Sequence, residues 1–177
     1  MDRIQTTYYN TPFGELILGS IDQKLCLCDW RYRKMRTSID ERIQSGLQAA
    51  YVEEGSDIIE ETKEQLSKYF SGKRKQFDIP LLLVGSEFQK QVWNELIQIP
   101  FGKTESYAGL SKKLGNEEAI RAVAAANGAN AISIIVPCHR ILGSDGSLTG
   151  YAGGLETKWK LLRLENALPQ GELPLQF

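Results

Sequence analysis

The stretch Val-Pro-Cys-His-Arg at 136–140 contains the one place in the chain where a thiol lies beside an imidazole. His139 is the sole histidine among 177 residues. The residues just before this stretch, 130–136, form a mainly apolar run with several β-branched members. Such a run predicts a buried strand that ends at the proline. We therefore expect the fold to be organised around a strand that brings Cys138 to a defined place.

Length, composition and cysteine content limit the class of protein. A chain of 177 residues that is 42% hydrophobic can form one ordinary domain or two small ones with a packed core. It has no apolar run long enough to span a membrane and no signal-peptide pattern, so we expect a cytoplasmic protein without membrane contact. Three cysteines, an odd number, fit a reducing compartment better than a disulfide framework.

The charge balance alone does not indicate a nucleic-acid partner. The chain has 21 basic and 22 acidic residues, a net charge of −1, whereas typical nucleic-acid binders are strongly basic. Between Lys103 and Arg163, however, eight basic residues stand against five acidic ones. This local excess allows a modest phosphate-facing surface with salt-sensitive binding.

The first half of the chain predicts an antiparallel sheet followed by a helix. Alternating apolar residues separated by turn signals predict strands over 4–9, 15–19 and 25–30. Cys26 and Cys28 lie on one face of the third strand, where we expect core residues rather than a zinc site, since the chain lacks enough further ligands.

The region after this sheet is less regular. Residues 31–56 are charged and only loosely helical, but 57–71 have one apolar face and precede Gly72, a helix stop. Residues 80–84 predict a short strand, and we place a domain boundary between 78 and 86. The expected domains are therefore 1–80 and 86–177.

The second half predicts a helix-turn-helix. Ser86 and Gln89 form a capping-box signature before a helix with apolar residues at helical spacing. A short helix over 106–114 is followed by a turn at Gly115, and a second helix runs from Asn116 to about 127. Alanines leave that second helix almost bare, as in a helix that enters a DNA groove or one packed inside the protein. Arg121, its one long cationic side chain, favours DNA.

Several blocks of this sequence, in order, resemble the O6-alkylguanine-DNA alkyltransferases, DNA repair proteins of the bacterial Ogt and Ada C-terminal type. The blocks are Phe88-Gln89, Val92-Trp93, Ile99-Pro-Phe-Gly102, Ser106-Tyr107, Arg121-Ala-Val123, Asn130, the motif at 136–140 with Ile141, Gly150-Tyr-Ala-Gly-Gly154 and Glu165. The resemblance implies a ribonuclease-H-like α/β N-terminal domain with an antiparallel sheet and a mostly helical winged-helix C-terminal domain.

The resemblance also implies an activity. We expect a monomer that transfers one methyl or larger alkyl group from O6-alkylguanine in double-stranded DNA, with O4-alkylthymine as an open alternative, to Cys138. The target nucleotide would be flipped out of the duplex, because a stacked base is inaccessible to the thiol. A thioether has no good leaving group, so each molecule would act once. No metal and no cofactor are implied.

Site residues follow from the resemblance one position at a time. The catalytic set is Cys138 as nucleophile, His139 reaching it through a water, Glu165 orienting the imidazole, Asn130 tying the turn, and Tyr107 donating to the purine. DNA contacts are expected from Arg121, Tyr107, Ala122, Ala125 and Arg140. The substrate pocket is expected to include Tyr151, Ala152 and Ile141, with Ala152 standing where relatives often have serine.

Two other classes of function remain alternatives at this point. A DNA-binding module without transfer activity is disfavoured by the presence of Cys138, since such relatives lack the cysteine. A cysteine hydrolase that uses Cys138, His139 and Glu165 would leave the helix-turn-helix and Arg121 without a role.

Overall fold

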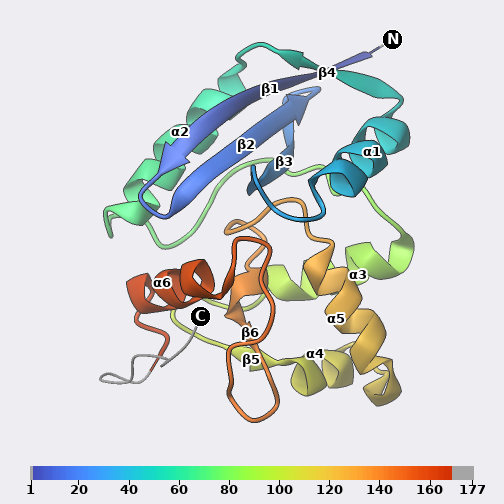
Figure 1. The fold of residues 1–177 in the computed structure, drawn as a ribbon, viewed down its shortest axis with the longest axis vertical. Helices are drawn as coiled ribbons and strands as arrows, with labels where there is room; N and C mark the ends of the chain where they lie inside the picture. Colours follow the sequence, from blue (N-terminus) through green and yellow to red (C-terminus); the bar gives the residue numbers. More distant parts are fainter. Residues whose placement is uncertain (1, 169–177) are drawn as a thin grey trace.

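The computed structural model describes residues 2–168, in which a sheet with two helices lies over a helical half (Figure 1). Met1 and the end of the expected second domain, 169–177, lie outside the described residues. The element order is β1 (Asp2–Thr11), β2 (Gly14–Ile21), β3 (Lys24–Trp30), α1 (Arg36–Leu47), β4 (Ala49–Glu53), α2 (Asp57–Phe70), α3 (Glu87–Ile97), β5 (Glu105–Ser106), α4 (Tyr107–Lys113), a 3-10 turn at Glu117–Ala119, α5 (Ile120–Gly128), a 3-10 turn at Cys138–Arg140, β6 (Ile141–Leu142) and α6 (Leu155–Leu164).

The first half forms a four-stranded sheet in the order β3-β2-β1-β4. The three predicted strands are confirmed and pair antiparallel, but β4 pairs parallel to β1, so the sheet is mixed rather than purely antiparallel. Both β4 and α1 fall in the charged region that showed only loose helical character. The residues of α1 are mostly polar, with Ile39 and Ile43 buried and Leu47 partly buried in the core, and β4 is a strand of only five residues.

The predicted ends of two helices are confirmed by their hydrogen bonds. Ser56 accepts from the amide of Ile59 at the start of α2, and Gly72, with a φ of +79°, follows its end. At the start of α3, Ser86 Oγ accepts from the Gln89 amide at 3.1 Å and Gln89 Oε1 from the Ser86 amide at 2.9 Å.

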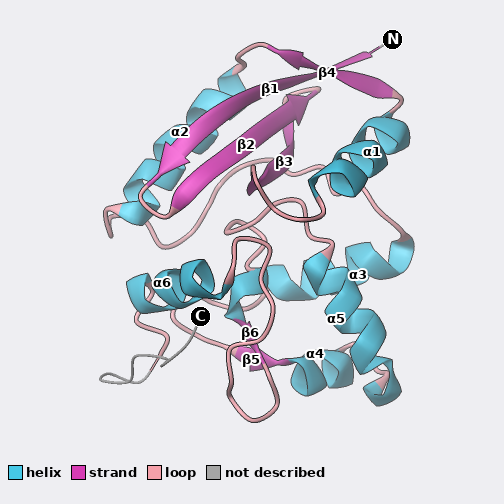
Figure 2. Cartoon of the chain, in the orientation of Figure 1, coloured by secondary structure: helices cyan, strands magenta, loops and turns pink. Residues whose placement is uncertain are grey.

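The helix-turn-helix is formed by α4 and α5 in the second half (Figure 2). Gly115, with a φ of +78°, turns the chain between them, and a 3-10 turn precedes the α-helix proper, which starts four residues later than Asn116. Trp93 Nε1 donates to the carbonyl oxygen of Ala126 at 2.8 Å and fixes α5 against α3. The pair β5 and β6 forms a two-stranded parallel sheet beside these helices.

Two predicted strands are wrong. Residues 80–84 make a single bridge, from Leu81 to Leu25. Residues 130–136 also make one bridge, from Ile132 to Cys28, and then leave the sheet edge in turns, with Ile134 at a φ of 73°. Ile132, Ile134 and Val136 are buried as predicted, but they pack between the two halves instead of extending a ladder.

None of the helices within residues 2–168 is both long and apolar enough to cross a membrane.

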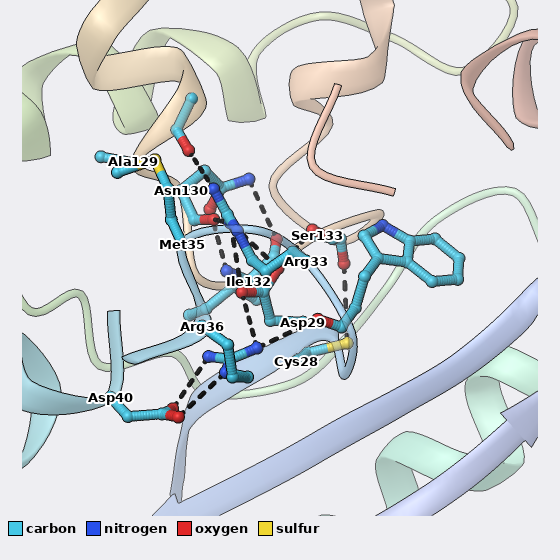
Figure 3. Close-up of polar contacts among 12 residues, drawn as sticks. Cys28, Asp29, Arg33, Met35, Arg36, Asp40, Ala129, Asn130, Ile132 and Ser133 are labelled. Atoms are coloured by element: carbon cyan, nitrogen blue, oxygen red, sulfur yellow. Dashed lines mark hydrogen bonds and ion pairs between the residues drawn. The ribbon is translucent and has the colours of Figure 1, made fainter. Parts of the chain in front are cut away.

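A buried polar network joins the end of β3 to the end of α5 (Figure 3). Asp29 accepts from Arg33 at 3.1 Å, from Arg36 at 3.0 Å and from the hydroxyl of Ser133 at 3.2 Å. Arg33 also donates to the carbonyl oxygens of Gly128 at 2.6 Å and Asn130 at 3.2 Å.

A second arginine of the first half acts in the same way, since Arg42 donates to the carbonyl oxygen of Ala129 at 2.8 Å. The last carbonyls of a helix have no partner within it, so these two arginines supply the C-terminal hydrogen bonds of α5. The first half of the chain thereby fixes the segment that leads to Cys138.

Replacing Arg33 with Met should lower the free energy of unfolding by roughly 3 kcal/mol, because the change leaves the buried Asp29 and the carbonyls of Gly128 and Asn130 short of a donor. Urea denaturation of the full chain measures the loss. Arg31→Met, which removes a half-exposed partner of Glu15 two residues earlier, should change stability little. Equal losses in the two variants would contradict this account.

Candidate active site

Cys138 begins a 3-10 turn and lies in the wall of a pocket of about 670 Å³. The second half of the chain lines this pocket with Tyr107 and Asn127 and with residues 150–155. The first half contributes residues 32–35, from the loop between β3 and α1. The thiol is buried but adjoins a space large enough for a purine-sized group.

His139 follows Cys138 in the same turn and is fully buried. Its Nε2 lies 2.6 Å from Glu165 Oε2, and Nδ1 has no hydrogen-bond partner among residues 2–168. A neutral imidazole that donates from Nε2 to a carboxylate carries an unprotonated Nδ1, which can accept a proton. The arrangement therefore has the atoms of a general base.

Glu165, the residue after α6, is held by several donors. Arg140 Nε donates to Oε1 at 2.7 Å and Arg140 Nη2 to Oε2 at 3.1 Å, while the hydroxyl of Tyr69 donates to Oε2 at 2.6 Å. Burial would raise the pKa of Glu165, but the interactions with His139 and Arg140 outweigh it and hold that pKa well below its ordinary value. Glu165 is therefore a carboxylate at neutral pH.

Burial also affects His139 and Cys138, which with Glu165 form the expected proton relay. It lowers the pKa of His139 against the attraction of Glu165, so the imidazole is neutral at pH 7. Burial raises the pKa of the Cys138 thiol, although hydrogen bonding to Asn130 and the charge of Lys158 favour the thiolate. Cys138 is thus a protonated thiol at rest and needs a base before it can attack.

Asn130 ties together the turn that leads to Cys138. Its Nδ2 donates to the carbonyl oxygen of Val136 at 2.9 Å, and its Oδ1 accepts from the amide of Ile132 at 2.9 Å. These bonds close the turn across six residues and hold the backbone two residues before the cysteine. The expected tie is present, and Ala131 after Asn130 does not prevent it.

The residues expected to contact DNA fall into two groups. Arg121, Ala122 and Ala125 are exposed along α5, and Tyr107, at the start of α4, is partly buried at the pocket. Arg140 differs, since it is buried, paired with Glu165, and donates to the carbonyl oxygen of Ile99 at 2.6 Å. In this structure the charge of Arg140 is therefore paired inside the protein, and its expected contact with DNA stays a prediction.

Of the three residues expected in the substrate pocket, two line it. Tyr151 and Ala152 line the pocket, and the Tyr151 hydroxyl accepts a hydrogen bond from Trp30 Nε1 at 3.0 Å. Ile141 is fully buried in β6, opposite Glu105, and is not among the residues that line the pocket. The part expected of it, a backbone carbonyl that accepts from the guanine amino group, stays a prediction.

Two buried polar side chains near the site escaped the sequence analysis. Lys158 of α6 donates to the carbonyl oxygen of Thr149 at 2.7 Å, and burial lowers its pKa to about 8, against the attraction of Cys138. A signal existed, since Lys158 lies three and four residues before Leu161 and Leu162, on the buried face of α6. Tyr69, by contrast, looks in sequence like an ordinary apolar helix position.

Within the described part of the chain, no three His, Cys, Asp or Glu side chains are grouped so that they could hold a metal ion.

Two family models match consecutive parts of the chain, and only residues 84–86 lie between the two matches. Residues 4–83 match the ribonuclease-like domain of 6-O-methylguanine DNA methyltransferase, and residues 87–167 match its DNA binding domain.

Individual relatives and solved structures agree with the two family models. A methylated-DNA--protein-cysteine methyltransferase from Methanosarcina acetivorans is 40% identical over 90% of this chain and 96% of its own length. One from Mycolicibacterium paratuberculosis is 41% identical over 94% of each chain. The structure of Mycobacterium tuberculosis OGT in complex with DNA is similar at a TM-score of 0.78 and 36% identity, covering 93% of both chains.

The relay predicts how the reactivity of Cys138 depends on pH. The rate of Cys138 alkylation by iodoacetamide should rise as His139 loses its proton, with a midpoint below pH 6.5, the ordinary histidine value. It should rise again above pH 9, where the buried thiol ionises without help. Peptide mapping separates Cys138 from the other cysteines.

The His139→Gln variant should lose the lower rise and keep the upper one. A wild-type rate that stays flat from pH 5 to the onset of thiol ionisation, about pH 9, would rule out His139 as the base.

Proposed function

Because the chain belongs to the 6-O-methylguanine DNA methyltransferase family, we propose that it repairs DNA by transferring a methyl group from the O6 of guanine to Cys138. The observation that carries this proposal is the buried thiol at the pocket, next to an imidazole that Glu165 orients at 2.6 Å. The substrate is O6-alkylguanine in double-stranded DNA, and the reaction is a direct reversal of the damage.

The chemistry balances without a cofactor. His139 Nδ1 takes the thiol proton, through one water, and the thiolate attacks the carbon bound to O6. The S–C bond forms as the C–O bond breaks, and its electron pair passes to the purine. The proton returned to the purine gives guanine and a neutral imidazole. Tyr107, partly buried at the pocket, is assigned the hydrogen bond to the purine while negative charge develops.

In this proposal the thiol proton leaves through one water to His139, so the geometry of His139 and Glu165 sets the rate of thiolate formation. Glu165 stays ionised beside His139 and stabilises the imidazolium that forms during transfer. Lys158, buried close to the pocket loop, favours the thiolate by its charge. The product is a thioether, which no described group is positioned to cleave, so each molecule acts once.

DNA binding is assigned to α4 and α5. The exposed face of α5 has the small residues Ala122 and Ala125, which allow a close approach of the helix to the DNA backbone and base edges. Arg121, exposed between them and the helix start, is assigned to the space left in the stack when the nucleotide is flipped into the pocket. The structure of Mycobacterium tuberculosis OGT in complex with DNA supports DNA as the partner.

Three further features belong to this proposal. The chain divides into functional domains at 1–80 and 86–177, and it acts as a monomer, because one chain contains every group that the transfer uses. It works in the cytoplasm, since a thiol that must accept an alkyl group has to remain reduced.

Incubation with a duplex oligonucleotide that carries one O6-methylguanine should add the mass of one methyl group to each protein molecule, mapped to Cys138. Intact-protein mass spectrometry measures it, and Cys138→Ser should gain nothing. An unchanged mass despite binding to the lesion would refute the transfer and leave a recognition module.

Replacing Arg121 with Ala should slow transfer from duplex DNA roughly tenfold, equal to about 1.4 kcal/mol, because the flipped state loses the side chain that fills the stack. Transfer from free O6-benzylguanine, which needs no flipping, should stay unchanged. Lys24→Ala, the loss of an exposed cation on the sheet, is the matched control. If both substrates were affected equally, Arg121 would act on the pocket rather than on flipping.

A further inference from the structure

The carboxylate of the relay is also contacted from the first half of the chain. Tyr69, near the end of α2, is buried, and its hydroxyl donates to Glu165 Oε2 at 2.6 Å. The same oxygen lies 2.6 Å from His139 Nε2. One carboxylate oxygen therefore joins a tyrosine of the first domain to the histidine that follows the nucleophile.

The position of the Tyr69 hydroxyl is fixed by packing. The ring lies edge-on to Phe70 at a centroid distance of 5.3 Å and to Phe101 at 6.3 Å, and is tilted against Phe77 at 5.4 Å. Phe101 belongs to the second half, so the ring sits at the junction of the two halves. A ring enclosed in this way has little freedom to turn its hydroxyl from Glu165.

The Tyr69 hydroxyl keeps its proton, and so remains a hydrogen-bond donor, over the whole pH range in which His139 titrates. Burial, and then the charge of Glu165, raise the pKa of Tyr69 well above its ordinary value. Glu165 Oε2 therefore always shares its negative charge between His139 and this O–H group, with Arg140 Nη2 at 3.1 Å as a third donor.

We propose that Tyr69 is a positioning residue for methyl transfer, which acts through Glu165 to set the basicity of His139. The inference rests on the proposed function, because it gives the first domain a part in the same relay. A hydroxyl that donates a hydrogen bond to a carboxylate weakens the interaction of that carboxylate with an imidazolium. Tyr69 thus keeps His139 a weaker base, neutral at the pH at which the thiol must lose its proton.

The sign of the effect follows directly. Without the hydroxyl, Oε2 has two donors instead of three and interacts more strongly with a protonated His139. The imidazolium is then favoured, and the titration of His139 moves to higher pH. The low-pH rise in the reactivity of Cys138 should move with it.

The chain offers a direct measurement, because His139 is its sole histidine. In an untagged full-length protein, the imidazole proton resonances in NMR spectra belong to one residue and report its titration without assignment. In Tyr69→Phe we expect the His139 midpoint to rise by roughly one pH unit. The low-pH rise in Cys138 alkylation by iodoacetamide should shift by the same amount.

Tyr51→Phe is the matched control. Tyr51 lies in the same half of the chain, and its hydroxyl donates to Asp40 Oδ1 at 2.8 Å, so this variant also loses a partly buried bond to a paired carboxylate. It should leave both midpoints unchanged. Thermal melts of the two variants show that each is folded and how much stability each loses.

The inference is overturned if the His139 midpoint is the same in Tyr69→Phe, Tyr51→Phe and wild type, since Tyr69 would then only stabilise the fold. Neither readout uses DNA, so a failed methyl transfer to Cys138 would refute the proposed function without touching this result. A shift in the His139 midpoint without a shift in Cys138 reactivity would also overturn it, because His139 would then not govern the thiol.

Discussion

The arrangement of the active site depends on one buried carboxylate, Glu165. Burying a charge is costly unless other groups compensate it, and here Arg140, His139 and Tyr69 do so with four short hydrogen bonds. Three of these bonds come from the 3-10 turn that begins with Cys138. The need to satisfy this charge therefore holds the turn against the end of α6, and with it the thiol.

A second buried network holds the chain on the other side of the cysteine. Arg33, paired with Asp29, binds the carbonyls at the end of α5, and Asn130 closes the turn that follows. Cys138 is thus positioned between two sets of buried polar contacts, and the first half of the chain contributes to both. This explains why the first half of the chain, which does not contain Cys138, is part of the working structure: Arg33 and Tyr69 hold α5 and Glu165 relative to one pocket.

The local signals in the sequence were reliable wherever the structure is decided by neighbours in the chain. The capping box at Ser86, the helix stop at Gly72, the turn at Gly115 and the three-stranded meander all depend on short-range geometry. The strand predicted over 130–136 was wrong because an apolar run rich in β-branched residues also occurs where a segment is buried without pairing in a sheet. The apolar side chains of 130–136 serve instead to pack two domains together, and periodicity alone does not distinguish these cases.

The sequence by itself placed a cysteine beside the sole histidine and so indicated Cys138 as the candidate nucleophile, and the order of its motif blocks indicated the family. The resemblance also pointed to Glu165 as the partner of His139. Only the tertiary structure decided that Arg140 pairs with Glu165, that Lys158 is buried beside the pocket loop, and that the Tyr69 hydroxyl donates to Glu165. These contacts join residues up to 96 positions apart in the sequence. Whether such residues meet depends on how the two halves of the chain pack, which no local sequence pattern records.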